Sequence, residues 1–302
     1  MVDRPFDIDA GEANTYFIYA AERNGVELAR LIRQAQLVLE LQGELFPDQL
    51  ERITSLHRIL DVACGPGGWA IEAARACPAR HVVGFDVSLP MIEHAQMFAE
   101  AEGVTNVEFL QMDALGPLDF PDASFDMING NYLYTFMTPR AWPAFLQECK
   151  RVLRPGGVIK VTEMEYGITS SPAAEELYRL WARTMKQAGR SFSCDGEHHG
   201  TTAMLRPLLR AAGYGPIGHK AYALDSSYGS PWHHAFLEDL ITICRHMQPF
   251  VRRVAGEEAL RRQQELLKES VGDIRAPGFT GIVYLLTAWG VNPASLPEGG
   301  RD

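Results

Sequence analysis

Three carboxylates in the first half of the chain share one sequence setting. Asp61, Asp86 and Asp113 each lie within or directly after a short run of apolar residues. Such runs are typical of strands buried in a parallel sheet, whose carboxyl ends meet at one edge. A carboxylate at that edge can accept hydrogen bonds from hydroxyl or ammonium groups. The pattern therefore predicts one shared site for a nucleotide-like ligand.

A glycine-rich loop follows the first apolar run, in the segment LDVACGPGGWA over residues 60–70. Glycine allows close approach of a ligand to the backbone, and the start of the following helix offers unpaired N–H groups. Gly65, Gly67 and Ala70 also fit the loose dinucleotide fingerprint G-x-G-x-x-G/A. The loop alone thus leaves the identity of the nucleotide open.

Further motifs make the first half of the chain more specific. The segments LPMI (89–92), FPDASFD (120–126) and RVLRPGG (151–157) follow in order. With the glycine loop and Asp86, they resemble the class I S-adenosylmethionine (SAM) dependent methyltransferases, especially the small-molecule type that includes the ubiquinone and menaquinone methyltransferases. The resemblance covers residues 58–163. It implies SAM as the cofactor and a small-molecule acceptor as the substrate.

The resemblance also assigns roles to residues of the cofactor site. Asp61 would lie near the methionine amino group, Gly65 and Gly67 along the methionine moiety, and Asn129 at its amino-acid part. Asp86 with the adjacent Val87 would bind the ribose. The adenine would contact Met91, Met112, Asp113 and the backbone of Ala114, and Tyr16 would fold over the cofactor.

A phenol, hydroxyl or ammonium acceptor would benefit from a nearby base, for which histidine is suited near neutral pH. We expect the catalytic base among His198, His199 and His233, in two segments where the family places its substrate cap. Core or surface packing is the more common role for histidines in such segments. Glu163, Tyr132 and Tyr134 are weaker candidates.

The elements that would position these residues form a doubly wound, Rossmann-like, mostly parallel seven-stranded α/β sheet with an added helical cap. Helical spacing before residue 55 predicts an N-terminal lid. We expect the remaining divisions to be a SAM-binding core (56–163), a cap insertion (164–200), a core helix and strand (201–225), a second cap insertion (226–277), and a last strand with a tail (278–302). Helices are predicted near 173–187 and 201–212.

The composition of the 302 residues narrows the functional class. The formal charge is −10, with 28 Lys and Arg against 38 Asp and Glu, which argues against a nucleic-acid partner. No apolar run reaches the length of a membrane span, and the acidic N-terminus does not resemble an export signal. The five cysteines are scattered, so we expect a cytoplasmic protein without a metal site.

Other functions stay open on the sequence alone. The same fold could use bound SAM in a reaction without methyl transfer, or keep the pocket as a binding module. An NAD-dependent oxidoreductase fits the glycine fingerprint, but it leaves Asp61 and Asp113 without a role. Pairing of two copies through the helical caps is also open.

Overall fold

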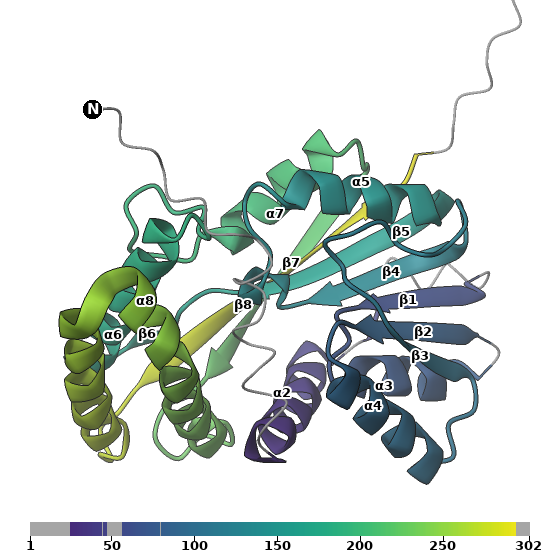
Figure 1. Cartoon of the computed structure of the whole chain (residues 1–302). Helices are drawn as coiled ribbons and strands as arrows, with labels where there is room; N and C mark the ends of the chain where they lie inside the picture. The colour runs from purple at the N-terminus through teal and green to yellow at the C-terminus, as the bar shows by residue number, and fades with distance from the viewer. Residues whose placement is uncertain (1–24, 44, 47–55, 79, 294–302) are drawn as a thin grey trace, which may run out of the picture.

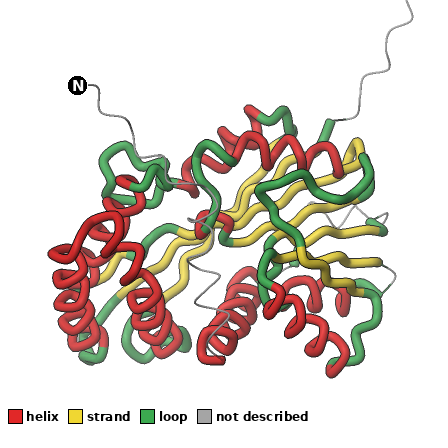
Figure 2. The backbone as a smooth tube through the Cα atoms, viewed as in Figure 1, coloured by secondary structure: helices red, strands yellow, loops and turns green. Residues whose placement is uncertain are grey.

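The central feature of the fold is a twisted sheet between two helical layers. The computed structural model describes residues 25–43, 45, 46, 56–78 and 80–293. A further group of helices lies beyond one end of the sheet (Figures 1 and 2). Tyr16 lies outside the described residues.

The sheet of the described chain has eight strands. Their bounds are β1 Arg58–Val62, β2 His81–Asp86, β3 Val107–Gln111, β4 Phe125–Asn131, β5 Leu153–Met164, β6 Ile168–Thr169, β7 Ile217–Asp225 and β8 Gly281–Val291. The strand order is β3-β2-β1-β4-β5-β8-β6, and β7 pairs with the other side of β8. The pairs among β1 to β5 are parallel, whereas β8 is antiparallel to its three partners.

The doubly wound α/β class is confirmed, but the predicted number of seven strands is wrong. The eighth strand is β6, in which Ile168 pairs with Ile282 of β8. Two residues give no readable periodicity, and this pairing forms only because β8 extends past the end of β5.

Helices cover both faces of the sheet, and others lie beyond its end. The helices of the described chain are α2 Gly25–Gln42, α3 Gly68–Ala76, α4 Leu89–Ala101, α5 Trp142–Val152, α6 Pro172–Gln187, α7 Thr201–Ala211 and α8 His233–Ile274, with a short 3₁₀ helix, η2, at Leu133–Thr135. Trp142, Phe145, Leu146 and Cys149 form the buried stripe of α5 and pack with α7 on one face. The opposite face is covered by α3 and α4, with Ile71 and Ile92 in a second core.

The helical group beyond the sheet consists mainly of α6 and α8, which pack through a third core. The α8 segment is two helices joined at Gly256, whose φ of 90° and ψ of 178° are non-helical. Trp181 Nε1 donates to Gln263 Oε1 at 3.0 Å, and Gln263 Nε2 donates to the Cys244 carbonyl at 2.8 Å. These bonds join both halves of α8 to α6, so the three segments form one packed unit.

The α2 helix bridges the core and this unit. It contacts both α3 and α8, and Arg33 Nη1 lies 2.7 Å from Glu238 Oε2. Among the described helices, none is both long and apolar enough to cross a membrane.

Candidate functional site

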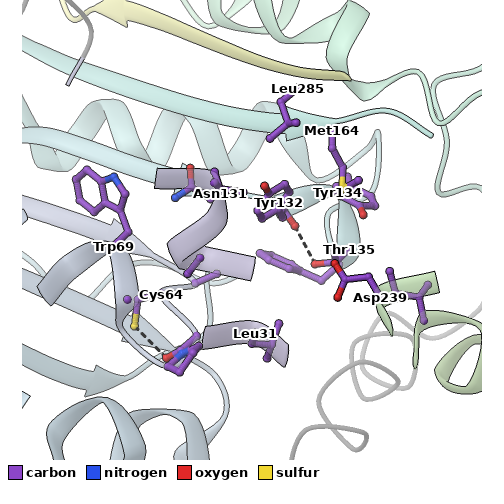
Figure 3. Close-up of a pocket in the computed structure, with 18 of the residues that line it drawn as sticks. Leu31, Cys64, Trp69, Asn131, Tyr132, Tyr134, Thr135, Met164, Asp239 and Leu285 are labelled. Carbon is purple, nitrogen blue, oxygen red and sulfur yellow. Dashed lines mark hydrogen bonds between the residues drawn. The ribbon is translucent and has the colours of Figure 1, made fainter. Parts of the chain in front are cut away.

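A cavity of about 380 Å³ lies at the carboxyl edge of the parallel strands and continues to the α6–α8 unit. Figure 3 shows Cys64 and Trp69 at one side of it and Asp239 at the other. Residues of the strand ends, of α2 and of the cap all line the cavity. One space therefore joins the predicted cofactor site to the predicted cap.

The glycine loop leads from β1 into α3 with left-handed backbone at Gly65 (φ 53°) and Gly67 (φ 82°). Gly65 lines the cavity, and a Cβ there would have open space around it. Gly67 is not among the lining residues: a Cβ there would lie 2.7 Å from the Phe109 ring and 2.8 Å from Ala95. Gly67 thus permits close packing of the loop against Phe109 and Ala95. Its contact with the methionine moiety stays a prediction.

Asp86 fixes the loop from the end of β2. Its Oδ2 accepts the Gly65 N–H at 3.0 Å, and its Oδ1 accepts the Ser88 N–H at 2.9 Å. Burial raises the pKa of Asp86, and the backbone hydrogen bonds oppose this rise. The carboxylate also lines the cavity, so it can hold a hydroxyl pair while it supports the loop.

Asp61 lies deeper, on β1, and is 2% exposed. Its Oδ1 accepts a hydrogen bond of 2.8 Å from Asn129 Nδ2. Burial raises the pKa of Asp61 to about 7, although the Asn129 bond and the charge of Lys160 lower it. Burying an ionised carboxylate costs free energy, because the group loses its hydration. A bound cation would offset this cost, so Asp61 fits a site that receives a cation.

Asn129 is fully buried and is not among the lining residues. It lies beside Asp61 in the β1–β4 register, which turns both side chains to one face of the sheet. Asn129 therefore orients Asp61, and its direct contact with the cofactor stays a prediction.

Replacement of Asn129 by alanine tests this supporting role. We expect the affinity for SAM to fall by about tenfold, because the charged Asp61 carboxylate loses the hydrogen bond that Asn129 donates to it. Titration calorimetry with SAM measures the change. An unchanged affinity would show that Asp61 does not depend on Asn129.

The other predicted cofactor contacts converge on the cavity. Its lining includes Val87, Met91, Met112, Asp113 and Ala114. The Asp113 carboxylate accepts the Leu115 N–H at 2.9 Å, which fixes the turn after β3. These side chains surround the space beyond Asp86, where the family resemblance predicts the adenine.

Of the three predicted histidines, the structure places only His199 on the cavity wall. His198 is exposed. His233 lies at the start of α8, where its ring packs on Tyr228 and Phe279. His199 is thus the predicted histidine that lines the cavity, and a catalytic role for any of the three stays a prediction.

The His199 ring is 1% exposed and has two distinct nitrogens. Nδ1 lies 3.0 Å from Thr201 Oγ1, whereas the buried Nε2 has no hydrogen-bond partner among the residues that the structure describes. The Tyr134 ring packs edge-on at a centroid distance of 4.4 Å. Burial and the nearby Arg190 charge lower the pKa of His199 to about 3, so its imidazole is neutral at pH 7.

Glu165, which the sequence analysis did not select, positions His199. Its Oε1 accepts the His199 N–H at 2.6 Å, and its Oε2 accepts the Gly200 N–H at 2.8 Å. The selected neighbour Glu163 is instead fully buried within β5, and burial raises its pKa well above the ordinary value. The strand extends to Met164, two residues further than its apolar run indicates.

The remaining wall is largely apolar and aromatic. Tyr132, Tyr134, Tyr166 and Trp181 line it, as does Asp239 from α8. Side chains on one face of α2 also line the cavity: Leu31, Ala35, Val38 and Leu39. The helical spacing of these residues predicts a lid. The spacing does not indicate that the lid covers this cavity.

Comparison with known proteins assigns the family. The methyltransferase domain family matches residues 59–157. The demethylmenaquinone methyltransferase of Thermus thermophilus is 41% identical over 106 residues, which are 35% of this chain and 46% of that protein. The counterpart from Lactococcus lactis is 31% identical over 180 residues, covering 54% of this chain and 68% of that protein. The chain belongs to the class I SAM-dependent methyltransferases.

The solved structures agree with this class I methyltransferase fold. The YcgJ protein of Bacillus subtilis superposes with a TM-score of 0.51 at 18% identity, over 82% of this chain and 97% of that one. The chain spans about half the length of the first curated relatives it matches, namely 46% and 50%. The family cofactor is SAM, and the buried Asp61 and the open Gly65 fit its cationic methionine end.

Proposed function

We propose that this methyltransferase transfers the methyl group of SAM to a small-molecule acceptor by direct in-line displacement. The observation that carries the proposal is the continuity of the cavity from Asp86 to His199. An acceptor in the cap region would share this space with the cofactor. Close approach and alignment are the main catalytic requirement for such a transfer.

SAM supplies an activated methyl group, since its sulfonium leaves as a neutral thioether. The chain itself holds the two reactants together and excludes water. Asp61 binds the ammonium, Asp86 binds the ribose hydroxyls, and Asp113 with Ala114 meets the adenine. The α2 helix and the α6–α8 unit enclose the acceptor.

His199 receives the proton released by the acceptor. As a hydroxyl oxygen of the acceptor bonds to the methyl carbon, its proton becomes strongly acidic, so a weak neutral base is sufficient. Nδ1–H donating to Thr201 Oγ1 leaves the lone pair on Nε2, the nitrogen without a partner. Glu165 keeps the ring in place through the backbone of the loop.

Product analysis tests the activity. The purified protein is incubated with SAM and a panel of phenols, amines and carbon acids, and S-adenosylhomocysteine and methylated acceptor are quantified. We expect the two products in equal amounts. Conversion of an acceptor without S-adenosylhomocysteine would indicate a non-methylating reaction, and binding of NADH in place of SAM would indicate an oxidoreductase.

The raised pKa of Asp61 predicts a pH-dependent cofactor affinity. Because Asp61 has a pKa of about 7, it becomes protonated as the pH falls below 7 and can no longer pair with the ammonium. We expect SAM affinity to fall more than about tenfold between pH 7.5 and 5.5. Calorimetry at several pH values measures this, and Asp61→Asn should remove most of the dependence. A flat wild-type profile would contradict it.

A further inference from the structure

The short η2 helix, which follows β4, forms part of the cavity wall. Four residues in and beside it line the cavity: Tyr132, Tyr134, Thr135 and Phe136. The ring of Tyr134 packs edge-on against His199 at a centroid distance of 4.4 Å. The conformation of η2 therefore determines the shape of the wall beside the proposed base.

The backbone enters η2 in an unusual conformation. Tyr132 has a φ of 57° and a ψ of 35°, in the left-handed region that residues other than glycine seldom adopt. Thr135 Oγ1 donates to the Tyr132 carbonyl at 2.9 Å (Figure 3). A left-handed residue costs free energy and persists only where the surrounding structure holds it. We therefore expect contacts from outside η2 to fix this turn.

The sheet holds the first residues of η2. The Tyr132 N–H donates to the Thr162 carbonyl at 2.9 Å. The Tyr134 N–H donates to Glu163 Oε2 at 3.3 Å, and the Leu133 backbone also hydrogen-bonds to this carboxyl group. Glu163 is fully buried and is not among the lining residues. Glu163 thus supports the cavity wall without forming part of it.

The cap holds the end of η2. Arg190 follows α6 and is 4% exposed, and its Nη2 donates to the carbonyl oxygens of Thr135 at 3.1 Å and Phe136 at 3.0 Å. Carbonyls at the end of a helix lack partners within the helix. Burial and the charge of Arg253 lower the pKa of Arg190 to about 10, so its guanidinium is charged at pH 7. Charged donors form the stronger hydrogen bonds, so Arg190 joins η2 firmly to the α6–α8 unit.

We propose that Glu163 and Arg190 are positioning residues, which hold η2 in the conformation that aligns the acceptor with the methyl group. This inference rests on the proposed function, because it assigns the η2 wall to the acceptor. Glu163 acts from the sheet and Arg190 from the cap, so the same turn is fixed from both sides. Burial lowers the pKa of His199 and the Arg190 charge adds to this effect, so Arg190 also acts on the proposed base.

Amide hydrogen exchange tests this hold on η2 without an acceptor. Glu163→Leu removes the group that accepts the Tyr134 N–H, whereas Glu163→Gln keeps an oxygen there. On protein saturated with S-adenosylhomocysteine, we expect the amides of residues 131–137 to exchange at least about tenfold faster in Glu163→Leu. Glu163→Gln should exchange as wild type does. Calorimetry should show unchanged S-adenosylhomocysteine affinity in both variants, because Glu163 does not line the cavity.

Arg190 is tested in the same way. Arg190→Met removes the donor to the η2 carbonyls and should also accelerate exchange over residues 131–137. Arg190→Lys keeps the charge without the planar guanidinium, so its exchange should lie between wild type and Arg190→Met. This milder variant decides the result if Glu163→Leu and Arg190→Met do not fold. Arg261→Met changes an exposed arginine of α8 and should exchange as wild type does.

Initial rates with an acceptor found by product analysis give the second readout. We expect kcat of Glu163→Leu to fall by about tenfold at an unchanged KM for SAM, and Glu163→Gln to restore most of it. Wild-type exchange over residues 131–137 in the folded variants would overturn the proposal, as would faster exchange without a loss of kcat. The predicted exchange in a protein that transfers no methyl group would overturn the proposed reaction, and not the hold of Glu163 and Arg190 on η2.

Discussion

Replacement of Asp86 by alanine should reduce the affinity for SAM by more than about 100-fold, equivalent to about 2.7 kcal/mol. The carboxylate accepts the N–H groups of Gly65 and Ser88, so its loss releases the glycine loop and the start of α4 together. It also removes the group proposed to hold the ribose. Two losses at one residue explain the large effect.

Calorimetric titration with SAM and with S-adenosylhomocysteine measures this change. Asp119→Ala, at an exposed aspartate outside the cavity, serves as the matched control and should bind as wild type does. Circular dichroism shows that the variant is folded. Retained affinity in folded Asp86→Ala would refute the ribose assignment.

Replacement of His199 by alanine should lower kcat by about 100-fold with little change in SAM affinity. The expected size is that of losing a positioned proton acceptor. Because burial lowers the pKa of His199 to about 3, the ring stays neutral between pH 5 and 9. Its titration therefore adds no acid limb to the wild-type kcat profile in that range.

Initial rates with an acceptor found by product analysis measure the effect. His198→Ala changes the neighbouring exposed histidine and should keep wild-type activity. Thr201→Val removes the hydroxyl beside Nδ1 and should give an intermediate loss of kcat, since the tautomer is no longer fixed. A fully active His199→Ala would exclude His199 as the proton acceptor.

The sequence predicts the cofactor half of the site better than the acceptor half. Apolar runs, a glycine loop and acids at strand ends are local signals, and they locate Asp61, Asp86 and Asp113 on one edge. The roles of Asn129 and Gly67 depend on which neighbour each faces. Register with β1 turns Asn129 toward Asp61, and a Cβ at Gly67 would meet the Phe109 ring. A single sequence contains no direct signal for the strand register or for this packing.

The acceptor half is built from contacts between distant segments. His198 and His199 are indistinguishable by residue type, and the carboxylate of Glu165, 34 residues earlier, determines where His199 lies. Asp239 lines the cavity because α8 packs on α6. Helical spacing alone indicates only that α8 has a buried side. The small β6 strand is likewise a consequence of the length of β8.

The position of β8 near the end of the chain has a consequence for the order of folding. The strand ends that carry the cofactor contacts lie within residues 58–131, so they leave the ribosome before β8 does. The acceptor wall includes Val283 and Leu285 of β8, and this strand also joins β5 to β7. During synthesis the nucleotide half can therefore assemble while the acceptor wall still lacks its last strand. Bound cofactor could stabilise that partial structure until β8 completes it.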